Sequence, residues 1–237
     1  MGTDSYFTIG ASHAAAGEPC QDYALHGAGF GVVADGCSSS SGRPDFGARV
    51  AAITLARVLE QHNIAPDAPH ETLLAGLRTM LATGVVDRED LLTTVGGFHV
   101  GDDGLQAWLW GDGVLFAEFA DGSTELKIVE AQDNTPMYPI YLLDPVPPRL
   151  TATINGNPVD PSLPFQWDFR GRPLRNFLLA TDGLNQIAGV PVNEAIAAFV
   201  AFKTVAGAFL KRRAMRALKA MTPVDDLAMV AWHETAR

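Results

Sequence analysis

The chain has 237 residues, of which 47% are apolar, and a formal net charge of −10 at pH 7. This length suits one large domain with a sizeable core, and we expect a single domain over residues 1–237. The acidic balance argues against nonspecific binding to nucleic acid or to anionic membranes, and no apolar run approaches the ~18 residues of a membrane span.

The N-terminal residues show no basic segment followed by an apolar one, so no secretory signal is expected. The two cysteines, Cys20 and Cys37, are too few for a disulfide scaffold and favour a reducing compartment. We therefore expect a cytoplasmic protein that acts away from membranes and nucleic acid.

Short strands and then two helices are predicted for the first third of the chain. Residues 8–10 and 29–34 are apolar runs bounded by small residues, which is typical of strands. Apolar residues recur at helical spacing over residues 45–60 and again over residues 71–83. These helices should form a hairpin, with residues 63–70 as the loop.

The periodicity then becomes that of strands. Four short apolar runs, separated by turns rich in Gly and Asp, predict an antiparallel meander. The runs are residues 93–100, 105–110, 115–119 and 125–129. Residues 132–173 are rich in proline and weakly periodic, and we expect an irregular excursion there with one strand near residues 150–154.

The last part of the chain predicts a strand at residues 177–181, a helical region at 192–221 broken near Gly207, and a strand at 227–232. Helices grouped in blocks argue against a doubly wound parallel sheet. We expect an α+β fold, namely a four-layer α-β-β-α sandwich of two antiparallel sheets flanked by helices.

Five aspartates mark places where apolar runs meet turns. They are Asp22, Asp35, Asp112, Asp182 and Asp225. Carboxylates at the ends of buried strands are costly unless positive charge meets them there. If these strand ends converge, the natural ligand is a hard divalent cation that prefers oxygen donors. Two such cations about 3.5–4 Å apart can activate a water and clamp a phosphoryl group.

Taken in chain order, the acidic segments resemble the motifs of the protein phosphatase 2C family. The segments are Gln21-Asp22, Val33-Ala34-Asp35-Gly36, Gly111-Asp112-Gly113, Ala180-Thr181-Asp182-Gly183-Leu184 and Asp225-Asp226-Leu227-Ala228-Met229-Val230. The resemblance covers nearly the whole chain and is to divergent bacterial members. It implies a metal-dependent phosphatase that uses Mn²⁺ or Mg²⁺ to hydrolyse phosphoserine and phosphothreonine in protein substrates.

The resemblance also implies roles for individual residues. Asp35 would bridge two metal ions, with the Gly36 carbonyl on one of them. Asp182 and Asp225 would complete the first site. Asp112 would join Asp182 at a third, weaker site.

Asp22 would lie near the second metal, directly or through water.

Three departures from the family pattern affect the groups around the metals. Gln21 stands where an acid is usual, and Cys37 stands where a histidine is a common general acid. Residues 10–22 contain no arginine for phosphate, so His13 is the nearest candidate. With Asp35 and Asp182, His13 and Cys37 complete the candidate catalytic set.

The serines that follow Asp35-Gly36 are candidates for substrate binding, with a solvated loop as the alternative. Ser38, Ser39 and Arg43 form this candidate set. Residues 134–139 open the proline-rich excursion and are expected to form a flap over the site or a surface loop.

Two other functions stay open from the sequence. The departures at Gln21 and Cys37 fit a catalytically weak domain that binds a phosphoprotein or another partner. A phosphatase for small phosphorylated metabolites also fits. Separately, the basic residues of 211–219 indicate the solvated face of a helix or a docking site for an acidic partner.

Overall fold

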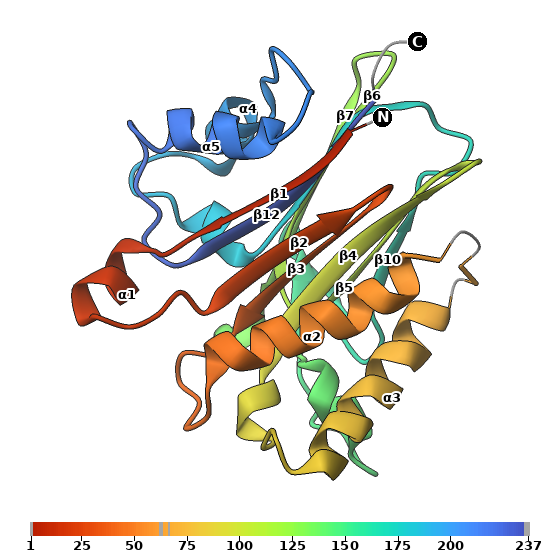
Figure 1. Cartoon of the computed structure of the whole chain (residues 1–237), viewed down its shortest axis with the longest axis vertical. Coiled ribbons are helices and arrows are strands. Elements are labelled where there is room, and N and C mark those ends of the chain that lie inside the picture. The colour runs from red at the N-terminus through yellow and green to blue at the C-terminus, as the bar shows by residue number, and fades with distance from the viewer. Residues whose placement is uncertain (1, 62–63, 66, 235–237) are drawn as a thin grey trace.

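The computed structural model describes residues 2–61, 64–65 and 67–234, and it shows two sheets stacked face to face with helices on both outer sides (Figure 1). The strands are β1 (Gly2–Thr8), β2 (Asp22–Gly27), β3 (Phe30–Gly36), β4 (Thr93–Gly101), β5 (Gly104–Trp110), β6 (Gly113–Phe119), β7 (Thr124–Ala131), β8 (Ala152–Ile154), β9 (Asn157–Val159), β10 (Phe165–Asp168), β11 (Leu174–Ala180) and β12 (Leu227–His233). The α-helices are α1 (Ala11–Ala16), α2 (Pro44–Leu59), α3 (Ala68–Thr83), α4 (Val192–Val200) and α5 (Phe209–Ala217).

Both sheets are antiparallel throughout the described residues. One has seven strands in the order β1-β12-β11-β6-β7-β8-β9, and the other has five in the order β10-β5-β4-β3-β2. Helices α2 and α3 cover the five-stranded sheet, while α4 and α5 cover the seven-stranded sheet. The expected four-layer α+β sandwich is therefore confirmed.

Three layers of apolar side chains hold the four layers together. Between the sheets, Phe98 packs edge-on against Phe177 with ring centroids 5.1 Å apart. Leu55 of α2 is buried against the five-stranded sheet, and Phe199 of α4 is buried against the seven-stranded sheet. Each such side chain stabilises the fold by about 1.5–3 kcal/mol through removal of apolar surface from water.

The two predicted helices of the first half form with small shifts. Helix α2 spans Pro44–Leu59, with Pro44 at a position where its missing N–H costs nothing. Helix α3 begins at Ala68, so it takes over the last residues of the predicted loop at 63–70. Asn63 and Pro66 of that loop lie outside the described residues.

The predicted meander is wrong at its centre. Strands β4 and β5 pair, and so do β6 and β7, but β5 and β6 belong to different sheets. The chain crosses between the sheets at Gly111 and Gly113, where φ is +93° and +147°. Glycine alone adopts such angles without strain, and a Cβ at Gly111 would lie 2.5 Å from Thr94 Cγ2. The periodicity of the sequence predicts each strand, but it does not show that the chain passes to the other sheet at these two glycines.

Two other segments differ from the prediction. Of the strand expected at residues 8–10, only Thr8 lies in a strand, as the last residue of β1, and Gly10 leads into the short helix α1. The proline-rich excursion contains three short strands instead of one. Strands β8 and β9 extend the seven-stranded sheet, and β10 forms the edge of the five-stranded sheet. The helical region at 192–221 is broken over residues 201–208, which includes the predicted break near Gly207.

No helix in the described part of the chain is both long and apolar enough to cross a lipid bilayer.

Candidate metal centre

The antiparallel order of the strands brings all five strand-end aspartates to one end of the sandwich. Asp22 begins β2 and pairs with Asp35 at the end of β3. Asp35 in turn pairs with Thr94 of β4, and the next β4 residue, Val95, pairs with Trp110 at the end of β5. In the other sheet, the end of β11 lies beside the beginnings of β6 and β12. Because antiparallel neighbours alternate in direction, ends and beginnings of adjacent strands meet at the same edge.

A pocket of about 140 Å³ opens at this end. It is lined by Asp35, Gly36, Cys37, Ser38, Ser39, Asp112, Asn134, Pro136, Tyr138, Asp182 and Asp225. A second pocket of about 280 Å³ adjoins it and shares Asp112, Asn134 and Asp182. Asp112 and Asp182 therefore lie between the two pockets.

Asp22 lies behind Asp35, away from the open pocket. Only 2% of its surface is exposed, and Thr181 Oγ1 donates a hydrogen bond of 2.6 Å to its Oδ2. The same hydroxyl accepts from the Ala228 backbone N–H at 3.0 Å, which fixes its orientation. Burial raises the pKa of Asp22 and of Asp35 well above the ordinary range, and the two side chains share a hydrogen bond.

Asp112 and Asp182 are also poorly solvated acids. Burial, followed by the charge of Asp182, raises the pKa of Asp112 to about 8. Burial and the charge of Asp225 raise the pKa of Asp182 to about 6, although Gln186 Nε2 donates to its Oδ2 at 2.8 Å. Within the described residues, neither carboxylate has an ion pair with a basic side chain, and their charged neighbours are other carboxylates.

This donor set fits divalent cations. Buried carboxylates that repel one another and lack basic partners are stabilised strongly by a positive charge placed among them. All of the donors are oxygens, which Mg²⁺ and Mn²⁺ prefer. Gly36 lies directly on the pocket, and a Cβ there would come within 2.4 Å of the Pro44 carbonyl oxygen, so a larger residue would disturb this wall.

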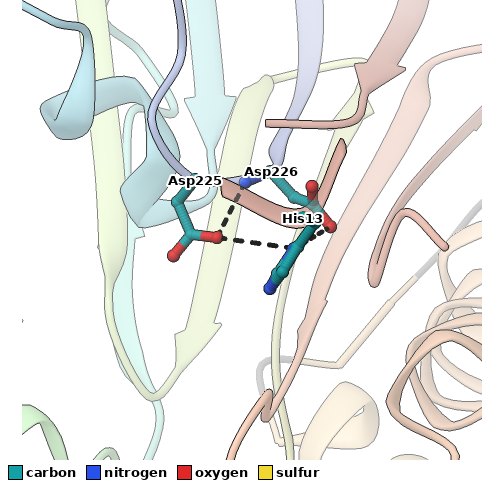
Figure 2. A group of neighbouring side chains, drawn as sticks. All are labelled: His13, Asp225 and Asp226. Atoms are coloured by element: carbon teal, nitrogen blue, oxygen red, sulfur yellow. Dashed lines mark hydrogen bonds and ion pairs between the residues drawn. The ribbon is translucent and has the colours of Figure 1, made fainter. Parts of the chain in front are cut away.

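Asp225 and its neighbour Asp226 have different surroundings, as Figure 2 shows. Asp225 lines the pocket, whereas Asp226 is buried and accepts hydrogen bonds from the backbone N–H groups of Gly10 at 2.7 Å and Gln21 at 2.5 Å. The Asp226 N–H donates to Asp225 Oδ1 at 2.8 Å. Asp226 thus ties the start of β12 to the N-terminal segment and holds Asp225 at the pocket.

His13 of α1 lies on the buried side of this acidic pair. Its Nδ1 is 3.0 Å from Asp226 Oδ2 and 3.8 Å from Asp225 Oδ1 (Figure 2). It is not among the described residues that line the pocket. The sequence suggested His13 as a phosphate contact, but this placement favours a role in holding Asp225 in position.

Cys37, Ser38 and Ser39 form one wall of the pocket, where the sequence placed them. Cys37 Sγ lies 3.2 Å from Ser39 Oγ. On the facing side, burial and a hydrogen bond with Cys37 raise the pKa of Tyr138 above its ordinary value. The first residues of the proline-rich excursion therefore border the site, through Asn134, Pro136 and Tyr138.

Arg43 lies outside the pocket, contrary to the expectation that it contacts substrate. Its Nη2 is 2.6 Å from Asp90 Oδ2, and its backbone N–H donates to Asp90 Oδ1 at 2.6 Å. The guanidinium also lies 4.9 Å from the centre of the Phe46 ring. The hydrogen bonds from Arg43 hold the pKa of Asp90 down to about 2. Arg43 thus anchors the start of α2 to the segment before β4.

Sequence reasoning missed two polar residues beside the site. Asn185 and Gln186 line the second pocket, and the position of Gln186 four residues after Asp182 was the available signal.

Gln21 is buried and donates through Nε2 to Glu18 at 3.2 Å. Its Oε1 has no hydrogen-bond partner among the described residues, and Gln21 is not one of the pocket-lining residues identified there.

Comparisons with known proteins agree with this architecture. The sequence model of the protein phosphatase 2C family matches residues 9–221. The serine/threonine phosphatase PstP/Ppp of Mycobacterium tuberculosis is 19% identical, with a TM-score of 0.62 and 98% of each chain covered. Stp1 of Staphylococcus aureus is 13% identical, with a TM-score of 0.64 over 100% of this chain and 96% of that one.

A further solved structure is the catalytic domain of the phosphatase PstP in complex with two manganese ions. It is 17% identical, with a TM-score of 0.58 over 97% of this chain and 96% of that one. At these identities the structural likeness shows the fold. A search of curated protein sequences found no significant match.

Proposed function

This chain belongs to the protein phosphatase 2C family, and we propose that it is a metal-dependent phosphatase for phosphoserine and phosphothreonine in protein substrates. The observation that carries the proposal is the pocket at which Asp35, Asp112, Asp182 and Asp225 meet, where the first three have no basic partner among the described residues and Asp225 has only His13, at 3.8 Å. Such a pocket is costly in a protein that binds no cation.

The residues that would hold two Mn²⁺ or Mg²⁺ ions are Asp35, the Gly36 carbonyl, Asp182 and Asp225, with Asp22 behind Asp35. Asp112 and Asp182 would hold a third ion. When bound, the ions supply a water of lowered pKa and neutralise charge on the phosphoryl group. The two manganese ions in the PstP catalytic domain support this choice of metal.

The chain's own groups would then position the substrate. Ser38 and Ser39 line the pocket, and their hydroxyls are suited to donate hydrogen bonds to phosphoryl oxygens. Pro136 and Tyr138 cover the other side and exclude bulk water from the reacting group. Cys37 Sγ is the nearest candidate to protonate the leaving oxygen of serine or threonine.

We assign no nucleophilic role to Cys37. Cysteine phosphatases need an arginine that closes a phosphate loop around the thiolate, and the nearest arginine, Arg43, is paired with Asp90. Attack by water in line with the leaving oxygen needs no covalent intermediate on the protein.

A second function, a catalytically weak domain that binds a phosphoprotein or partner, is favoured by one observation. Gln21 occupies a buried position next to Asp22 where the family usually has an acid, and its Nε2 donates a hydrogen bond to Glu18. A third function, hydrolysis of small phosphorylated metabolites, would use the same pocket.

Phosphate release from three substrates separates these functions. We expect Mn²⁺-dependent release from a phosphothreonine peptide and from p-nitrophenyl phosphate, and none in EDTA. Activity on sugar phosphates without activity on the peptide would favour the metabolite enzyme. The absence of Mn²⁺-dependent turnover on every substrate would reject the enzyme and leave the binding domain.

A further inference from the structure

Helices α4 and α5 lie together over the seven-stranded sheet (Figure 1). A small hollow lined by basic residues lies between the end of α4 and α5. Its volume is about 90 Å³. We call it the α4–α5 hollow, and it is lined by Ala201, Phe202, Lys203, Thr204, Phe209, Arg212, Arg213 and Arg216. Four of these eight residues carry a positive charge, in a chain whose formal net charge is −10.

No ion pair in the described part of the chain involves Lys203, Arg212, Arg213 or Arg216. These four cations therefore have no carboxylate partner there. Arg212 Nη2 donates to the Ala206 carbonyl at 2.7 Å and to Thr204 Oγ1 at 3.3 Å. Arg213 Nε donates to the Ala198 carbonyl. These bonds orient two guanidinium groups without neutralising them. Like charges gathered in this way repel one another, with water and salt screening the exposed ones, and an anion placed among them would be attracted by all four.

The N-terminus of α5 does not account for the hollow. Its free backbone N–H groups at Leu210 and Lys211 already donate to Asp4 Oδ2, at 2.6 Å and 3.1 Å. The positive potential of the hollow therefore comes from side chains, three of which are arginines. The arginine fork matches the oxygens of a phosphoryl group, with which it forms paired charge-assisted hydrogen bonds.

The size of the hollow restricts the ligand. Pockets for drug-sized molecules measure about 300–1,000 Å³, so this hollow accepts a single compact anionic group. A phosphoryl dianion is compact and can accept from several donors at once. We propose that the α4–α5 hollow binds a phosphoryl group carried by a phosphorylated peptide segment.

This site is separate from the metal centre. The two share no lining residue among those described. Phe202 packs against His233 at the end of β12, with ring centroids 5.9 Å apart, whereas Asp225 precedes the beginning of that strand. A phosphopeptide held here would dock on the protein without entering the reacting pocket. The inference thus goes beyond the proposed hydrolysis and does not require it.

Isothermal titration of the full chain in EDTA tests the proposal, because EDTA removes the metals at which phosphate would otherwise bind and react. The ligands are a phosphoserine peptide, the same peptide with serine, and inorganic phosphate. The variants are Arg216→Ala and Lys203→Ala, whose side chains are exposed and form no hydrogen bond or ion pair with the described residues. Lys219→Ala is the matched control, since it also removes one exposed positive charge near α5 but does not line the hollow.

We expect the phosphoserine peptide to bind and the serine peptide not to bind. Arg216→Ala and Lys203→Ala should each weaken binding by about tenfold or more, as expected for loss of a charge-assisted hydrogen bond, with Lys219→Ala within about twofold of the parent. Equal losses in all three variants, or no binding of the phosphopeptide, would overturn the site. If inorganic phosphate bound as tightly as the phosphoserine peptide, the proposal that a peptide carries the phosphoryl group would be overturned.

Discussion

Replacing Asp182 by asparagine should lower Mn²⁺-dependent phosphate release on the order of a thousandfold, which corresponds to about 4 kcal/mol of the barrier. Asparagine keeps the size of the side chain and can still accept the hydrogen bond from Gln186. It removes the negative charge that lies between the two pockets of the site. The loss should therefore reflect weaker cation binding and not a collapse of the fold.

The same exchange at Asp102 is the control for the Asp182→Asn variant. Asp102 is exposed in the turn between β4 and β5, far from the metal end of the sandwich. Its replacement by asparagine should leave kcat/KM unchanged. Full turnover in Asp182→Asn, measured with a phosphothreonine peptide across a range of Mn²⁺ concentrations, would contradict the metal assignment.

The metal-free protein should become more stable as the pH falls from about 8 to about 5. The folded-state pKa values of Asp112 and Asp182 are raised to about 8 and about 6, so the folded chain binds protons more tightly than the unfolded chain. The stabilisation from these protons is fully present below the ordinary aspartate pKa of ~3.9, and it is lost as the pH rises through 6 and then 8. The free energy of unfolding should fall by a few kcal/mol over this range.

Urea denaturation in EDTA at pH 5, 6, 7 and 8 measures this dependence. Asp112→Asn should flatten the part of the curve near pH 8, because the replacement side chain does not titrate. Mn²⁺ should restore stability most strongly at pH 8, where it replaces the lost protons. A stability that rises steadily with pH in EDTA would show that these carboxylates are not strained by burial.

The positions of the aspartates at strand ends could be predicted from the sequence because they depend on local features. Each of Asp35, Asp112 and Asp182 follows an apolar run, and Asp225 precedes one. That these strand ends meet at one edge depends on the strand order of the two sheets, which periodicity left open, and the expectation of a joint site came from the resemblance of the ordered motifs. The order of the layers could be predicted from helices grouped in blocks.

Other features depend on contacts that the sequence does not encode locally. Arg43 pairs with Asp90, 47 positions away, so no spacing rule predicts that its guanidinium leaves the substrate pocket. His13 turns towards Asp226 because the short helix α1, which the periodicity did not reveal, follows Gly10. The crossing between sheets at Gly111 and Gly113 was hidden for a similar reason, since Gly-Asp-Gly is equally typical of a hairpin turn.

The most direct test of the metal centre is anomalous X-ray diffraction at the manganese absorption edge, from crystals of the full chain grown with Mn²⁺. The account predicts at least two strong peaks in the pocket lined by Asp35, Gly36, Asp182 and Asp225. It also predicts that these peaks are lost in Asp182→Asn crystals or reduced there. Manganese bound only elsewhere on the protein, with this pocket free of anomalous signal, would contradict the account.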